Sequence, residues 1–216
     1  EVDAHFVGHP LLDAISALKE IDIDQFKAEN NLNQKEIIAL LPGSREQEVT
    51  KMLELMLSVR PNFQEYQFVI AGAPSLPKEF YQKFVDENVH FVSNKTYDLL
   101  RCSKAALVTS GTATLETALL NIPEVVCYRS SRISYEIGKR VVKNIKYISL
   151  VNLIMDQEIV TELIQSDLNT KNLVKELELI LKGNSREKML HNFELLRERL
   201  GGKGASDLAA EIIING

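Results

Sequence analysis

Residues 37–45, Ile-Ile-Ala-Leu-Leu-Pro-Gly-Ser-Arg, decide the fold class of this chain. Their five consecutive apolar residues predict a strand that is buried on both faces, and Pro42 and Gly43 end it. Apolar residues then recur at helical spacing from Val49 to Val59, which predicts an amphipathic helix. A buried strand that leads into such a helix is the repeating unit of a parallel sheet.

The same unit recurs along the chain. Further strands are predicted at 68–71, 89–92, 105–108, 125–128 and 147–150. Helices are predicted between them, at 79–85, 97–102, 113–120 and 134–142. From about residue 158 onward only helical patterns follow, at 168–181, 185–200 and 205–214. We therefore predict an α/β fold with a doubly wound parallel sheet, made of a Rossmann-like domain (1–157) and a helical C-terminal extension (158–216).

Composition excludes several classes of protein. The chain has 216 residues, 45% hydrophobic and 25% charged, which are the proportions of an ordinary globular protein. Its formal net charge is −5, whereas a general nucleic-acid binder carries a basic excess, so no nucleic-acid partner is expected. No run of about 18 apolar residues is present, so no membrane-spanning helix is predicted. The chain begins at Glu1 rather than Met, and we expect it to be part of a longer protein.

The loop after the first strand combines a glycine, a hydroxyl and an arginine. Gly43 permits a tight turn, Ser44 stands where the helix begins, and Arg45 falls in its first turn. Free amides at a helix N-terminus favour an anion, and arginine adds a bidentate donor suited to phosphate. A simpler interpretation takes Ser44 as the helix N-cap and Arg45 as an exposed surface residue. This loop alone leaves both interpretations open.

A second loop, at residues 109–116, repeats the pattern after the strand at 105–108. Ser110, Gly111 and Thr112 are small residues that open a helix, and Glu116 follows one turn later. Hydroxyls and amides suit a pyrophosphate, and a carboxylate suits the two hydroxyls of a ribose, so the loop fits a nucleotide. The alternative is that Thr112 only caps the helix and Glu116 is an acid favoured by the helix dipole.

Other common motifs are absent from the sequence. No G-x-G-x-x-G follows a strand, so the usual dinucleotide fingerprint is missing. The four histidines are scattered, without the spacing of metal ligands, and no metal site is predicted. No G-x-S-x-G motif is present, and Ser110 has no assignable histidine partner.

Five stretches of the chain are distinctive as a set. They are residues 6–13 (Phe-Val-Gly-His-Pro-Leu-Leu-Asp), 41–48 (Leu-Pro-Gly-Ser-Arg-Glu-Gln-Glu), 110–116 (Ser-Gly-Thr-Ala-Thr-Leu-Glu), 148–154 (Ile-Ser-Leu-Val-Asn-Leu-Ile) and 162–165 (Glu-Leu-Ile-Gln). In order and spacing this set resembles the lipid-A-disaccharide synthases over nearly the whole chain. The 110–116 loop by itself is similar to that of many GT-B glycosyltransferases. One departure is Val151, where the family usually has proline.

The resemblance implies an inverting hexosyltransferase of lipid A biosynthesis that requires no metal or other cofactor. Such enzymes transfer 2,3-diacylglucosamine from UDP-2,3-diacylglucosamine to 2,3-diacylglucosamine 1-phosphate. The implied location is cytoplasmic and peripheral at the inner membrane, because both substrates carry acyl chains. The chain matches the C-terminal, UDP-sugar-binding half, so we expect it to lack the general base and to transfer no sugar alone. The implied partners are the missing N-terminal domain, the lipid acceptor and, through the C-terminal helices, a second copy.

The resemblance also implies roles on two loops. Arg45 would stabilise the UDP leaving group, and Gly43 and Ser44 would shape its loop and contact the donor. Val92 and Ser93 lie at the turn where GT-B proteins usually bind the base through backbone groups.

The remaining implied site residues belong to the second half of the chain. Ser110, Gly111 and Thr112 would bind the pyrophosphate through amides and hydroxyls, and Glu116 would bind the ribose. Asn152 would contribute to the substrate site.

Two other functions stay open at this point. One is another GT-B enzyme, such as a UDP-sugar 2-epimerase, against which residues 8–10 and 150–152 argue. The other is a non-enzymatic binding module in which the loops only cap their helices.

Overall fold

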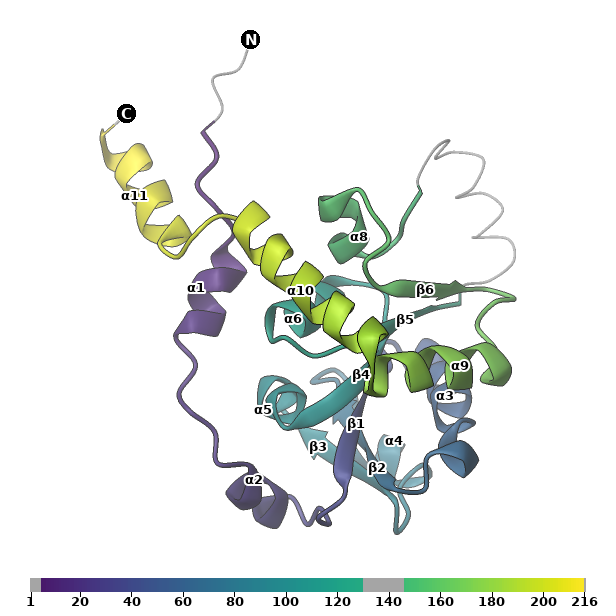
Figure 1. Cartoon of the computed structure of the whole chain (residues 1–216). Helices are drawn as coiled ribbons and strands as arrows, with labels where there is room; N and C mark the ends of the chain where they lie inside the picture. Colours follow the sequence, from purple (N-terminus) through teal and green to yellow (C-terminus); the bar gives the residue numbers. More distant parts are fainter. Residues whose placement is uncertain (1–4, 130–145, 216) are drawn as a thin grey trace.

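Six parallel strands form one sheet at the centre of the molecule (Figure 1). In the computed structural model, residues 5–129 and 146–215 are described. The strands are β1 (Glu36–Leu41), β2 (Tyr66–Gly72), β3 (Val89–Ser93), β4 (Ser103–Thr109), β5 (Glu124–Tyr128) and β6 (Thr161–Ile164), in the order β3-β2-β1-β4-β5-β6. The predicted doubly wound parallel sheet is confirmed.

Helices cover both faces of the sheet, and the alternation of side chains along β1 shows how. Ile38 and Leu40 lie in one apolar cluster, with side chains of α3 (Glu46–Leu57) and α9 (Thr170–Leu181). Ile37, Ala39 and Leu41 lie in another, with side chains of α2 (Ile23–Glu29) and α5 (Thr96–Arg101). Both faces of the strand are therefore buried, as the unbroken apolar run predicts.

The other helices are α1 (Pro10–Ser16), α4 (Lys78–Gln82), α6 (Thr112–Leu119), α8 (Leu150–Met155), α10 (Asn184–Arg199) and α11 (Ala205–Asn215), with a 3-10 turn at Arg60–Asn62.

The predicted strand at 147–150 is wrong. Residues 147–149 are a loop, and Ser149 caps α8 by accepting a hydrogen bond from the Asn152 amide at 3.3 Å. The sixth strand is instead β6, which pairs with β5. It escaped prediction because this edge strand is only four residues long and mostly half-buried, so its apolar pattern is weak.

Beyond residue 158 the chain is therefore not only helical, because β6 belongs to the sheet. The three predicted C-terminal helices are confirmed as α9, α10 and α11. The division into domains at residue 157 stays a prediction. The helix predicted at 134–142 lies outside the described residues.

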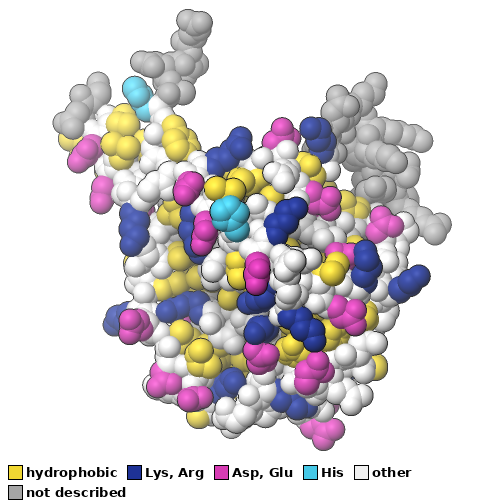
Figure 2. Space-filling model, viewed as in Figure 1, with side chains coloured by type: hydrophobic (Ala, Val, Ile, Leu, Met, Phe, Trp, Pro, Cys, Tyr) yellow, Lys and Arg dark blue, Asp and Glu magenta, His cyan; other side chains and the backbone are white. Residues whose placement is uncertain are grey.

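The N-terminal segment and α11 leave the body of the molecule side by side (Figure 1). Asp13 of α1 joins them, because its carboxylate accepts hydrogen bonds from the amides of Gly204 (2.6 Å) and Ser206 (3.0 Å). Apolar side chains are exposed on α11, where Ile213 and Ile214 are 81% and 80% accessible (Figure 2).

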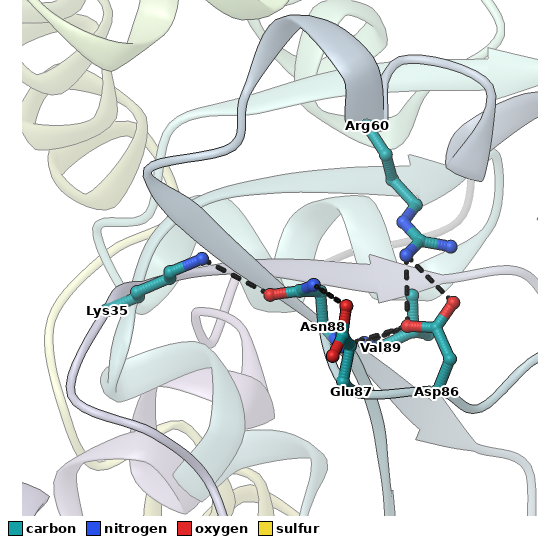
Figure 3. A network of polar contacts seen from close by, with 6 residues as sticks. All are labelled: Lys35, Arg60, Asp86, Glu87, Asn88 and Val89. Carbon is teal, nitrogen blue, oxygen red and sulfur yellow. Dashed lines mark hydrogen bonds and ion pairs between the residues drawn. The ribbon is translucent and has the colours of Figure 1, made fainter.

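A polar network ties the starts of the strands at the amino edge of the sheet (Figure 3). The Lys35 ammonium, just before β1, donates to the Asn88 side chain at 3.2 Å, and the Arg60 guanidinium lies 2.8 Å from Asp86. Asp86 also accepts from the backbone amides of Asn88 and Val89. A cavity of about 560 Å³ lies beside the network. This edge is opposite the loops that hold the predicted site residues, so we assign these contacts to the stability of the fold.

One buried residue conflicts with the apolar interior. Glu124, at the start of β5, is fully buried, and neither of its carboxylate oxygens has a hydrogen-bond partner among the described residues. Glu124 pairs with Ala106 of β4, so the two side chains lie on one face of the sheet. Burial raises the pKa of this carboxyl well above its usual value. The group is therefore expected to be protonated in the folded state.

The substitution Glu124→Met should stabilise the chain, because it removes an unpartnered buried carboxyl and keeps a similar volume. We expect a gain of about 1–3 kcal/mol in the free energy of unfolding at neutral pH. In the unfolded chain the Glu124 carboxyl has a pKa near 4.5. Above that pH the unfolded chain loses the carboxyl proton, whereas the folded protein keeps it. Stability therefore falls as pH rises from there toward the folded pKa, and the gain from Glu124→Met should grow over that window.

Urea unfolding of both proteins between pH 4.5 and 8 measures this difference, with Glu54→Met on the exposed side of α3 as the control. A gain that does not change with pH, or a loss of stability, would contradict the prediction.

Candidate functional site

The order of the sheet selects one place for a site. The order of the strands across the sheet proceeds from β1 through β2 to β3 toward one edge, and from β4 through β5 to β6 toward the other edge. The connections after the neighbouring strands β1 and β4 therefore diverge at their carboxyl ends, and open α/β sheets bind ligands at such a point. The two loops singled out in the sequence, 42–45 and 110–112, are the two that flank this point.

Gly43 brings the first loop close to the end of β4. Its φ of +97° is a conformation that favours glycine, and a Cβ there would lie 3.6 Å from the Thr109 side chain. The backbone oxygen of Ser44 accepts a hydrogen bond from the Ser75 hydroxyl at 2.9 Å, which ties this loop to the loop after β2.

Arg45, and not Ser44, is the N-cap of α3, and no side chain caps this helix. The simpler interpretation is therefore wrong about Ser44 as the cap, but its other part, an exposed Arg45, agrees with the structure. The Arg45 side chain is 82% exposed and lies 3.2 Å from Glu48, on the next turn. An exposed ion pair of this kind contributes little to stability, so the guanidinium can exchange it for a phosphate at small cost.

The second loop presents backbone at the start of α6. Gly111 precedes the helix without a side-chain cap, and, apart from its chain neighbours, no heavy atom of the described residues lies within 4 Å of the place where its Cβ would be. Thr112, the first residue of α6, is exposed. The Ser110 hydroxyl donates to the Ile148 backbone oxygen at 3.1 Å. Helix α6 therefore begins at two exposed residues, Gly111 and Thr112, and free amides at a helix start favour an anion.

Glu116 lies one turn into α6 and is half-buried. Its Oε1 accepts a hydrogen bond from the Tyr97 hydroxyl at 2.8 Å. Tyr97 comes from the first turn of α5, so this contact joins the helices that follow β3 and β4. No signal in the sequence pointed to Tyr97.

Val92 and Ser93 lie at the carboxyl end of β3, two strands away from β1. Val92 is buried and Ser93 is half-buried. They therefore lie at the same edge of the sheet as the two loops, with β2 between β3 and β1.

Asn152 lies inside the protein, with no exposed surface. Its Oδ1 accepts from the amides of Ile159 (2.8 Å) and Val160 (3.0 Å). Its Nδ2 donates to the Val160 oxygen and to Glu162 Oε1, both at 2.8 Å. These contacts use all four hydrogen-bonding positions of the amide, so the side chain holds the fold together at this point.

Glu162 of β6 is the centre of this network. Its carboxylate accepts from the amides of Ile148 (2.8 Å) and Ser149 (2.9 Å), from the Ser149 hydroxyl (2.7 Å) and from Asn152. The segment it holds is the one that accepts the Ser110 hydrogen bond. Glu162 stands in one of the five distinctive stretches, yet nothing in the sequence gave it this role.

Two kinds of feature were not found among the described residues. Among them, no group of three or more His, Cys, Asp or Glu side chains is arranged to hold a metal ion. No helix in the same part of the chain is long and apolar enough to cross a membrane.

Solved structures share this fold at low sequence identity. The S. aureus MnaA–UDP co-structure matches 96% of this chain and 53% of its own chain, with a TM-score of 0.62 and 15% identity. WaaG, a glycosyltransferase involved in lipopolysaccharide biosynthesis, matches 89% of this chain and 51% of its own, with a TM-score of 0.53 and 16% identity. At these identities the likeness concerns the fold alone, and it is the fold of GT-B glycosyltransferases.

Sequence comparison is more specific. The family model for lipid-A-disaccharide synthetase matches residues 1–213. The lipid-A-disaccharide synthase of Syntrophus aciditrophicus (strain SB) is 37% identical over 97% of this chain, and that of Sulfurihydrogenibium sp. (strain YO3AOP1) is 34% identical over 96%. The chain spans 56% and 58% of the lengths of these two relatives. It belongs to the lipid-A-disaccharide synthase family.

Proposed function

We propose that this chain is the donor-binding half of a lipid-A-disaccharide synthase. In that reaction 2,3-diacylglucosamine passes from its UDP derivative to 2,3-diacylglucosamine 1-phosphate, with inversion at the sugar carbon, and UDP leaves. The observation that carries the proposal is the pair of glycine-containing loops at the carboxyl ends of the neighbouring strands β1 and β4, in a chain of this family.

The chemistry of the donor half is electrostatic. As the sugar–oxygen bond breaks, negative charge develops on the departing pyrophosphate. The amides at the start of α6 and the Arg45 guanidinium supply positive charge where that group would lie. Gly43 and Ser44 shape the Arg45 loop, Ser110 to Thr112 would hold the phosphates, and the Glu116 carboxylate would accept from the ribose.

The acceptor hydroxyl also needs a general base. We assign that base to the part of the relatives' length that this chain does not span, and we expect the chain by itself to transfer no sugar. The lipid acceptor, the N-terminal domain and a second copy that docks through the C-terminal helices are the proposed partners. The proposed location of the whole enzyme is the cytoplasmic face of the inner membrane.

A UDP-sugar 2-epimerase is the alternative with some structural support. A UDP-N-acetylglucosamine 2-epimerase structure from Listeria monocytogenes matches with a TM-score of 0.54, but at 17% identity. The family match over residues 1–213 favours the disaccharide synthase.

The chain should bind UDP in a calorimetric titration, and Arg45→Ala should weaken that binding about tenfold (~1.4 kcal/mol) by removing a charge-assisted contact to phosphate. Arg199→Ala, which removes another exposed arginine on α10, is the matched control and should leave the affinity unchanged. Failure of the unmodified chain to bind UDP would overturn the donor-site assignment.

The substitution Glu162→Gln should disturb the site from a distance, because it turns an acceptor of four hydrogen bonds into a group that carries its own donors. We expect a loss of about 2–3 kcal/mol in the free energy of unfolding and weaker UDP binding, since the 148–152 segment supports Ser110.

Glu176→Gln on α9 is the control for this test. Among the described residues, its carboxylate accepts only from the side chains of Thr161 and Lys175, so its loss should cost less and leave UDP affinity unchanged. If the two variants behave alike, Glu162 has no special part in holding the loop.

A further inference from the structure

A hydrogen bond joins Tyr97 and Glu116 in the helices that follow β3 and β4. Its two residues are 19 positions apart and come from different helices, α5 and α6. Both side chains are half-buried. Their oxygen atoms lie 2.8 Å apart, with the phenol as donor and the carboxylate as acceptor. Hydrogen bonds to an ionised acceptor are stronger than neutral ones, so this contact restricts where Glu116 can point.

The donor in this pair keeps its proton. Burial, together with the hydrogen bond to Glu116 and its charge, raises the pKa of Tyr97 to about 12. The phenol therefore remains an O–H donor over the whole physiological range of pH. Among the described residues, Tyr97 is the only group that donates to the Glu116 carboxylate. Glu116 Oε2 and the second lone pair of Oε1 are left to accept other donors.

Tyr97 contributes little to the apolar interior. Of the described residues, the two apolar clusters include Leu99 and Leu100 of α5 but not Tyr97. A tyrosine on the first turn of a short helix, half-buried and directed at a carboxylate, is therefore better explained by its hydroxyl than by its ring.

We propose that Tyr97 is a positioning residue, which holds the Glu116 carboxylate in the orientation that accepts the ribose hydroxyls of a nucleoside diphosphate. This inference rests on the proposed function, which places the ribose at Glu116. The two hydroxyls of a ribose are adjacent donors, and a carboxylate can accept both at once when its plane is fixed. Without the phenol O–H, the carboxylate gains rotational freedom that binding must remove.

Calorimetric titrations with UDP and with 2′-deoxy-UDP test this role, because the second probe lacks one of the two ribose donors. They are made on the unmodified chain, Tyr97→Phe, Glu116→Gln and the double variant. Tyr66→Phe, a change of another half-buried tyrosine at the opposite edge of the sheet, is the matched control. Melting temperatures of all the proteins are recorded in parallel.

We expect Tyr97→Phe to weaken UDP binding about three- to tenfold, to weaken 2′-deoxy-UDP binding less, and to leave the melting temperature within a few degrees. Because the phenol acts through Glu116, the double variant should bind UDP no more weakly than Glu116→Gln alone. Tyr66→Phe should change neither affinity. A smaller preference for UDP over 2′-deoxy-UDP in Tyr97→Phe is the readout that a purely structural role would not move.

Three outcomes would contradict the role of Tyr97, and they distinguish its failure from failure of the proposed function. If UDP binds and Glu116→Gln weakens it, but Tyr97→Phe does not, the positioning role is wrong and the donor site stands. If Tyr97→Phe weakens both nucleotides equally, or adds to the effect of Glu116→Gln, Tyr97 does not act through Glu116. If the unmodified chain binds no UDP, the donor site and the role of Tyr97 fall together.

Discussion

The pairing of β1 with β4 is the constraint on which the rest of the structure depends. These two central strands are parallel, and the chain proceeds away from them in opposite directions. Backbone groups inside the sheet are satisfied by neighbouring strands, so free amides occur where strands give way to helices. The reversal of strand order places two such ends next to each other. The proximity of two loops with available amides is thus a consequence of the connectivity before any side chain is considered.

Side chains from other parts of the chain then support the two loops. Glu162, on the edge strand β6, holds the segment that accepts the Ser110 hydroxyl. Tyr97, on the helix after β3, holds Glu116. Ser75, after β2, holds the loop of Ser44. Ser44, Ser110 and Glu116 are therefore each supported by a polar contact from a different strand–helix unit, which restricts the motion that ligand binding would otherwise have to suppress.

The proposed division of labour between two halves of an enzyme agrees with the charges seen here. Departure of UDP requires positive charge and oriented amides, and both are present at the ends of β1 and β4. Activation of an acceptor hydroxyl requires a base, which we assign to the part of the relatives that this chain does not span. The N-terminal segment and α11 meet through Asp13 at one side of the body, and the exposed isoleucines of α11 lie there too.

The sequence by itself determined the α/β class, five of the six strands and the two loops, because unbroken apolar runs followed by glycine and helical spacing are local signals. It did not locate β6, whose four residues are mostly half-buried on an edge. It also could not assign the partners of Glu116, Ser110 and Glu162, which lie 10 to 38 positions away along the chain. Only the tertiary structure decided these contacts, because the packing of separate strand–helix units against one sheet, and not any local pattern, brings those side chains together.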